Sequence, residues 1–187
     1  MGAEVTQRAF LKTLIAGSPV WQAWTGANTA AEAGAFVTWP DYAGQLLPFC
    51  VLVIHDTSHV RQPGAGVHTS VKASGGIQVL VYDRVAGEGN SDVYHEQLQA
   101  ALDAQDFGAY QLLIETEDTR FGTLFTDLID ECITSERLQV SGQKINSVYK
   151  PPMPWRRTRL DVEANDETAA FTGPLWQAEA TFQWGRQ

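Results

Sequence analysis

Two strand-forming runs joined by a long polar stretch constrain the fold of this chain more than any other feature. Residues 49–54 are continuously apolar, and residues 77–82 are rich in β-branched and aromatic side chains, as strands prefer. Between them, Pro63-Gly64-Ala65-Gly66 is a strong turn signal. We therefore predict that the two runs pair as an antiparallel hairpin with its tip at Pro63–Gly66.

The outer part of this hairpin, residues 55–74, consists mainly of Ser, Thr, His and basic residues with little to bury. We predict that it projects from the body of the protein as an arm. Folding about the predicted tip places His59 near His68. Gly75-Gly76 lies where the arm meets the body, and paired glycines in a strand pattern indicate a bulge or a joint.

Helical periodicity marks residues 6–15, 92–105 and 121–135. The third segment is the clearest, because apolar residues recur at helical spacing along one side and predict a face packed on a sheet. That stripe comprises Phe121, Leu124, Phe125, Leu128, Ile129, Cys132 and Ile133. The buried side predicted for the second helix comprises Val93, Leu98, Ala101 and Leu102.

The remaining strand signals lie mostly in the second half of the chain. Residues 176–184 alternate strictly between apolar and polar, which predicts one buried and one exposed face. Weaker signals predict strands at residues 36–39, 107–115, 138–140, 145–149 and 155–162. The predicted class is α+β: an antiparallel or mixed β-sheet with a long projecting β-hairpin, covered on one side by two or three helices. No linker divides the chain, so we predict a single domain over residues 1–187.

Composition limits the functions that fit. The net charge of −9 and a pI near 4.8 argue against free nucleic acid as a ligand for the whole surface. No apolar run approaches the roughly 20 residues that span a bilayer, so no membrane partner is expected. Nor does the start of the chain carry the basic residues of a signal peptide, and we expect a cytosolic origin. Cys50 and Cys132 occupy apolar positions and are expected to be reduced and buried.

The histidines of the arm are the best ligand cluster in the sequence, yet they do not predict a metal site. His55 and His59 on one strand are about 13 Å apart at about 3.3 Å per residue, too far for one ion. His59 and His68 alone would supply two ligands. Catalytic serine and phosphate-loop motifs are also absent from the sequence. We therefore expect no enzyme activity, catalytic residue, bound metal or cofactor. The alternative is a small metal-dependent hydrolase that uses His59, His68 and a carboxylate.

One dense basic patch stands out in this acidic chain: Trp155, Arg156, Arg157 and Arg159, with Lys150 nearby. Two acidic runs, at residues 115–118 and 161–167, offer complementary charge, so we interpret the patch as a contact with another copy of the chain. A solvated face and a phosphate-binding surface are the alternatives. The acidic cluster of Glu115, Glu117 and Asp118 is itself interpreted as a solvated loop and helix start.

The predicted functional residues therefore belong to contact surfaces with a neighbouring subunit or an adjoining ring. They are His55, His59, Arg61, His68 and Lys72 of the arm, and Trp155, Arg156, Arg157 and Arg159 of the basic patch.

The order of these elements resembles that of tailed-bacteriophage tail terminator (tail completion) proteins. The resemblance rests on a leading helix, a strand, the long arm with its Gly75-Gly76 return into residues 77–83, two covering helices and the terminal strand at residues 175–184. The chain departs from smaller members of that family in its loops at residues 27–34 and 151–154.

The resemblance implies a structural virion protein, assembled in the bacterial host cytoplasm, that forms a hexameric ring. This ring would terminate the tail tube and join it to the head, with the tail tube protein and a neck or head-completion protein as partners. DNA would only pass through its lumen. Head–tail connector proteins of the neck are similar in size and class and remain an alternative, as does a ligand-binding module with no assembly role.

Overall fold

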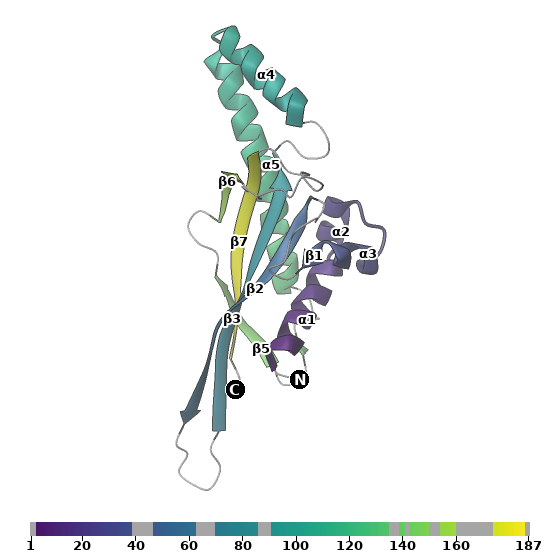
Figure 1. Cartoon of the computed structure of the whole chain (residues 1–187), viewed down its shortest axis with the longest axis vertical. Helices are drawn as coiled ribbons and strands as arrows, with labels where there is room; N and C mark the ends of the chain where they lie inside the picture. The colour runs from purple at the N-terminus through teal and green to yellow at the C-terminus, as the bar shows by residue number, and fades with distance from the viewer. Residues whose placement is uncertain are drawn as a thin grey trace, which may run out of the picture.

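The chain is described by a computed structural model that covers residues 3–38, 47–62, 70–85, 91–134, 139–140, 143–149, 154–159 and 174–185 (Figure 1). The helices are α1 (Ala3–Ala16), α2 (Pro19–Thr25), α3 (Ala30–Ala35), α4 (Ser91–Asp103) and α5 (Phe107–Thr134). The strands are β1 (Val37–Thr38), β2 (Phe49–Gln62), β3 (Ser70–Arg84), β4 (Gln139–Val140), β5 (Gln143–Tyr149), β6 (Trp155–Arg159) and β7 (Pro174–Gly185). The class is α+β, as predicted.

The described strands form one mixed sheet in the order β1-β2-β3-β7-β5-β4, and β6 also pairs with β7. Only β1 and β2 are parallel among these pairs. One edge of β7 pairs with β3 along its length, from Ser74↔Gly185 to Arg84↔Leu175. Its other edge pairs with β5 and then with β6. The strand with the cleanest alternation in the sequence is therefore internal to the sheet.

Strands β2 and β3 pair as the two runs predict, from Phe49↔Tyr82 to Ile54↔Ile77. The register then shifts, and pairing continues to Gln62↔Ser70. The shift sets two residues of β2 opposite Gly75, so a β-bulge lies at the predicted joint, with the extra residue on β2. A Cβ on Gly76 would lie 3.0 Å from Thr181 Cγ2 of β7, which accounts for a glycine at this position.

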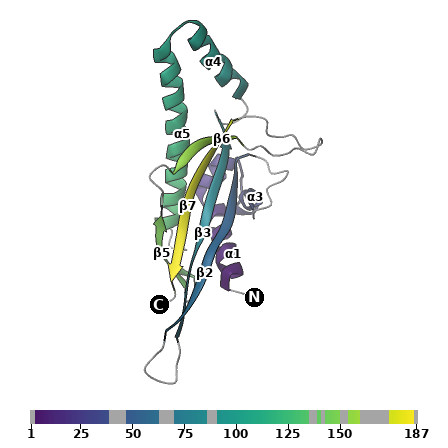
Figure 2. The ribbon, with the colours of Figure 1, turned by 60° about the vertical axis from the view of Figure 1, so that its left-hand side comes forward.

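The prediction that His59 lies opposite His68 is wrong, because His59 pairs with Ala73. Its error was to centre the turn too early in the chain: pairing persists as far as Gln62↔Ser70, so the connection comprises residues 63–69. That connection, which includes His68, lies outside the described residues. The part of β3 that precedes Ser74 does not pair with β7. There the ends of β2 and β3 extend past the rest of the sheet (Figures 1 and 2). We call residues 58–62 and 70–74 the β ribbon.

The main core lies between the sheet and helices α1, α2 and α5. From the sheet it receives alternate residues of three strands: Cys50, Leu52, Ile77, Val79, Val81, Trp176, Ala178, Ala180 and Phe182. The helices contribute Leu11, Ile15, Trp21, Phe121, Phe125, Leu128 and Ile129, all nearly inaccessible to solvent. A smaller cluster on the other face contains the stacked rings of Phe49 and Tyr82, whose centroids are 4.9 Å apart.

Residues 107–115 are helical, so the strand predicted there is wrong. They form the first part of α5, which begins when Asp106 Oδ1 accepts a hydrogen bond of 2.9 Å from the Ala109 N–H. The stretch contains one β-branched residue, Ile114, and its Ala, Gln, Leu and Glu residues favour a helix, which packs against α4. Residues 27–34 were predicted to form a loop, and that prediction is wrong for most of the stretch, because it contains most of α3, which Thr29 caps.

Three apolar residues predicted to be buried are exposed: Val93, Leu102 and Ile133. For Val93 and Leu102 the reason is geometric. The outer half of α5 extends past the end of the sheet, and among the described elements α4 is its packing partner there (Figure 2). A two-helix pair buries a narrower stripe than a helix on a sheet does, and Tyr94 and Ala101 occupy that stripe on α4. Ile133 lies at the other end of α5, next to the last residue of the helix, Thr134.

Leu128 of α5 is fully buried against the sheet and tests the packing of the core. We expect Leu128→Ala to lower the free energy of unfolding by about 2–5 kcal/mol, because it removes buried methyl groups and leaves a cavity. Chemical denaturation provides the measurement. The exposed Asp127 on the same helix is the control, and Asp127→Ala should change stability by less than about 0.5 kcal/mol. Equal effects from the two variants would contradict the packing described.

Candidate functional site

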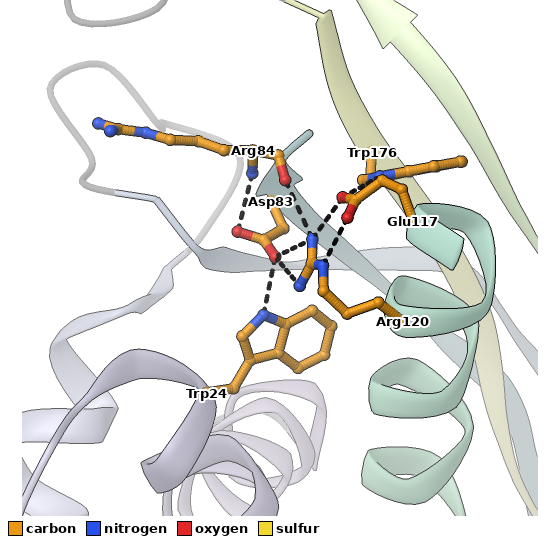
Figure 3. Close-up of polar contacts among 6 residues, drawn as sticks. All are labelled: Trp24, Asp83, Arg84, Glu117, Arg120 and Trp176. Carbon is orange, nitrogen blue, oxygen red and sulfur yellow. Dashed lines mark hydrogen bonds and ion pairs between the residues drawn. The ribbon is translucent and has the colours of Figure 1, made fainter. Parts of the chain in front are cut away.

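A cluster of charged side chains lies where the end of β3 meets the middle of α5 (Figure 3). Arg120 of α5 donates from Nη2 to Glu117 Oε1 at 2.8 Å and from Nε to Glu117 Oε2 at 2.9 Å. Both of its terminal nitrogens also lie 3.3 Å from Asp83 Oδ2 on β3. Asp83 and Glu117 are buried, whereas the Arg120 side chain is 30% exposed. One guanidinium therefore bridges two buried carboxylates.

Two tryptophans also donate hydrogen bonds to these carboxylates. The indole N–H of Trp24 on α2 donates to Asp83 Oδ2 at 3.0 Å, and that of Trp176 on β7 donates to Glu117 Oε1 at 3.0 Å. The rings of both tryptophans contact the ring of Phe121, one edge-on and the other stacked. The network therefore connects α2, β3, α5 and β7 through polar bonds embedded in the aromatic core.

Backbone groups of Arg84 also belong to the network. Its N–H donates to Asp83 Oδ1 at 2.8 Å, and its carbonyl accepts from Arg120 Nη2 at 3.2 Å. Its own side chain points away from the cluster (Figure 3). Arg120 therefore binds the end of β3 at two groups, the side-chain carboxylate of Asp83 and the main-chain carbonyl of Arg84.

Burial has different consequences for the pKa of Asp83 and for that of Arg120. It raises the pKa of Asp83 above its ordinary value, and the bonds from Trp24, Arg120 and the Arg84 N–H only partly oppose this. For Arg120, burial alone would lower the pKa, but the hydrogen bonds and charges of Glu117 and Asp83 outweigh it and raise the pKa. The asymmetry follows from exposure, because the guanidinium reaches solvent and the Asp83 carboxylate does not.

A third tryptophan bonds to the same turn of α5. Trp155, the first residue of β6, donates from its indole N–H to Asp118 Oδ1 at 3.1 Å. Its ring lies directly over Gly122, where a Cβ would come within 2.6 Å of Trp155 Cζ2. The edge strand β6 is thus fixed to the helix by a hydrogen bond and by a close contact that requires glycine.

These contacts correct the interpretation of the acidic cluster at residues 115–118. The cluster lies inside α5 and is not a loop. Glu117 is buried and Asp118 is half-buried, and both accept bonds from within the chain, while Glu115 is exposed. Trp155 and Asp118, predicted as members of surfaces that meet across copies of the chain, therefore meet within one chain.

The other predicted contact residues in the described part of the chain lie on three strands, β2, β3 and β6. The backbones of His55, His59, Arg61 and Lys72 belong to β2 and β3, with Arg61 opposite Val71 and Lys72 opposite Val60. Arg156 is exposed on β6 and lies 3.4 Å from Gln177 Oε1. Arg157 and Arg159 follow on the same strand, opposite Trp176 and Pro174. The acidic run at residues 161–167 and Lys150 lie outside the described residues.

Asp83, Arg120, Trp24 and Trp176 were not among the residues predicted to form a site. Glu117 and Arg120 are three residues apart, a spacing that pairs charges on one helix face. That spacing becomes visible only if α5 is recognised as helical from Phe107 onward. No sequence signal links Asp83 to Arg120, since they are 37 positions apart in the sequence with a helix between them.

The network can position structural elements, but its arrangement does not favour catalysis. Each carboxylate accepts from one indole and from the guanidinium, so its lone pairs are directed to groups within the protein. The described residues contain no group of three or more His, Cys, Asp or Glu suited to a metal ion. Cys50 and Cys132 are buried free thiols, and burial raises the pKa of both, that of Cys132 to about 12.

Comparisons with family models, with curated proteins and with solved structures give no match for this chain. In the described part of the chain, every helix is too short or too polar to cross a membrane.

Arg120→Met tests the bridge from Arg120 to Asp83 and Glu117, because it leaves two buried carboxylates without their cation. We expect it to lower the free energy of unfolding at pH 7 by about 3 kcal/mol, the low end for a broken buried ion pair, because the guanidinium is partly exposed. The pKa of Asp83 is raised from 3.8 in the folded state, so protonation favours folding as the pH falls through the raised pKa. The loss caused by Arg120→Met should therefore shrink between pH 7 and about pH 4.

Denaturant titrations at several pH values provide this measurement, with Arg84→Met as the matched control. The Arg84 side chain points away from the network, so its removal should change stability by less than about 0.5 kcal/mol (Figure 3). A loss of stability in Arg120→Met that does not change with pH, or an equal loss in Arg84→Met, would contradict an ionic bridge from Arg120 to the two carboxylates.

Gly122→Ala tests the contact between α5 and β6. Glycine to alanine normally stabilises a helix interior by about 1 kcal/mol. Here we expect destabilisation by about 1–3 kcal/mol, because the added Cβ meets the Trp155 ring at 2.6 Å. Gly108→Ala, on the exposed start of the same helix, meets no contact shorter than 3.4 Å and should be neutral or stabilising. Thermal melts that rank the two variants in the reverse order would contradict the packing of Trp155.

Proposed function

We propose that this chain is the subunit of a homo-oligomeric ring that terminates a bacteriophage tail tube and joins it to the head. The hexamer implied by the resemblance is the form we expect. On this proposal, the tail tube protein lies on one side of the ring and a neck or head-completion protein on the other. The protein acts by assembly, and no residue of the chain performs a chemical step.

The observation that carries this proposal is the presence of two extensions at opposite ends of the molecule (Figure 1). The β ribbon extends from one end, and α4 with the outer half of α5 extends from the other. The second extension exposes large apolar side chains, above all Phe107 at 68% and Leu112 at 64%. We interpret these exposed apolar side chains on a protruding element as part of a protein-interaction surface, which favours a subunit over an isolated monomer.

The sheet edge formed by β6 fits the same proposal. Within the described part of the sheet, β6 pairs only with β7, and no described strand pairs with its other edge. Three of its five residues are arginines, and charged residues protect an open edge against unspecific strand pairing. A basic edge on an acidic chain is suited to a charge-selected contact with another subunit, as the sequence predicts for Arg156, Arg157 and Arg159.

The net charge of −9 supports the passage of DNA through such a ring. A negatively charged wall repels the phosphate backbone and lets the duplex slide without binding. The β ribbon, with Arg61 and Lys72, is then the expected contact with the neighbouring subunit or the adjoining ring.

The register of the β ribbon does not favour the alternative of a metal-dependent hydrolase. That alternative relied on His59 and His68 lying opposite one another, and the register instead pairs His59 with Ala73. A connector of the neck shares the ring architecture and is separated from a tail terminator by its partner, which the experiment below includes.

Sedimentation velocity and negative-stain electron microscopy of the purified chain test the proposal. We expect a concentration-dependent assembly that contains closed rings with a central lumen. Added to tubes polymerised from the tail tube protein of the same phage, the rings should cap tube ends and stop elongation. Rings that bind a head-completion protein but ignore tube ends would identify a neck connector. A strict monomer at high protein concentration would contradict both assembly functions.

A further inference from the structure

The extension formed by α4 and the outer half of α5, residues 91–116, is here called the helical arm. Its helices meet in a tight turn, where the Gln105 N–H bonds to the Leu102 carbonyl and the Asp106 N–H to the Ala101 carbonyl. Asp106 then caps α5. These bonds define the end of the arm as a fixed structure, which can present side chains in one geometry.

The tip of this arm carries apolar side chains among acidic ones. Leu102 and Phe107 flank the turn and Leu112 follows on α5, and all three are exposed. Residues 91–116 include no Lys or Arg. The acidic residues of the arm are Asp92, Glu96, Asp103, Asp106 and Glu115. A surface of this kind selects a partner that is apolar and carries positive charge at its rim.

The same chain contains a groove with that chemistry between α1 and α3. Its volume is about 620 Å³, within the range of roughly 300–1,000 Å³ typical of binding pockets. Its walls are mainly the methyl groups of alanines, including Ala9 on α1 and Ala31 on α3, and Lys12 and Thr13 are its polar residues. Among the described residues that line it, none is acidic.

The shape of the groove follows from small residues at the helix crossing. Gly34 of α3 is buried, and a Cβ there would lie 3.6 Å from Ala16 Cβ and 3.8 Å from Lys12 Cε. The aliphatic part of Lys12 therefore lies beside the α3 backbone. Small residues let the two helices approach closely and leave the wall of the groove without bulky side chains, so large apolar groups have room to enter.

We propose that the tip of the helical arm, centred on Phe107, docks into the α1–α3 groove of a second copy of the chain. The apolar side chains match the alanine walls, and the acidic residues beside the tip match Lys12. Tip and groove lie in different parts of one copy, so a head-to-tail contact between copies is possible and can repeat around a ring (Figure 1). This inference rests on the proposed ring function and specifies one of its subunit contacts.

Sedimentation equilibrium of complementary variants tests the contact. We expect Phe107→Ser to raise the dissociation constant of assembly roughly 30-fold, as the loss of a buried aromatic anchor does. Ala31→Glu, which places a negative charge in the groove, should weaken assembly comparably. Ile133→Ser removes an equally apolar exposed residue from the opposite end of α5 and should leave assembly unchanged.

Mixing the two defective variants is the decisive measurement. A contact between tip and groove leaves one intact tip and one intact groove in the mixture, so Phe107→Ser and Ala31→Glu should form a heterodimer at protein concentrations too low for either variant to assemble alone. Failure of the mixture to associate would overturn the proposal, and so would weakening by Ile133→Ser equal to that by Phe107→Ser.

A charge exchange gives a second route that preserves the fold. Asp103 lies at the carboxyl end of α4, where lysine is favoured by the helix dipole, so Asp103→Lys should not destabilise the arm. We expect Asp103→Lys and Lys12→Glu each to weaken assembly about tenfold or less, and the double variant to recover much of the loss. Rings that form equally well in all variants would overturn this contact and leave the ring function standing. A monomeric wild-type protein would overturn both.

Discussion

The bridge from Arg120 to Asp83 and Glu117 is the interaction on which the rest of the structure depends. It lies at the point where α5 leaves the sheet: the part of α5 that follows it packs in the core, and the part that precedes it belongs to the helical arm (Figure 2). Trp24 and Trp176 bind the same carboxylates, so α2, β3 and β7 are fixed to this turn of the helix. The orientation of the arm relative to the sheet is therefore set by a few directional bonds.

This arrangement explains why an acidic chain places charges in its core. A buried carboxylate is stabilised only when donors surround it, and the two indoles and the guanidinium provide those donors. Apolar residues at these positions would fill the same space without specifying an angle between helix and sheet. Trp155 over Gly122 adds a further constraint on the neighbouring turn and holds β6 at the sheet edge. The directional bonds supply orientation, and the apolar core supplies most of the stability.

Patterns with a local period were read correctly from the sequence. The alternation at residues 176–184 identified β7, and the apolar runs at 49–54 and 77–82 identified the paired parts of β2 and β3. The errors arose where a partner distant in sequence decides the outcome. Residues 107–115 pack as a helix against α4, and Glu117 is buried because Trp176 and Arg120 satisfy it. The register of the β ribbon also depended on a bulge whose extra residue no local signal places on β2 rather than β3.

Hydrogen exchange measured by mass spectrometry tests the central claim most directly, because it compares the isolated and the assembled chain residue segment by segment. On our proposal, the helical arm and the α1–α3 groove bind one another across two copies of the chain. Assembly should therefore slow exchange in peptides covering residues 101–113, 9–16 and 30–35, and leave the already protected strands β3 and β7 unchanged at residues 77–82 and 176–182. Assembly without added protection at the arm and the groove would contradict it.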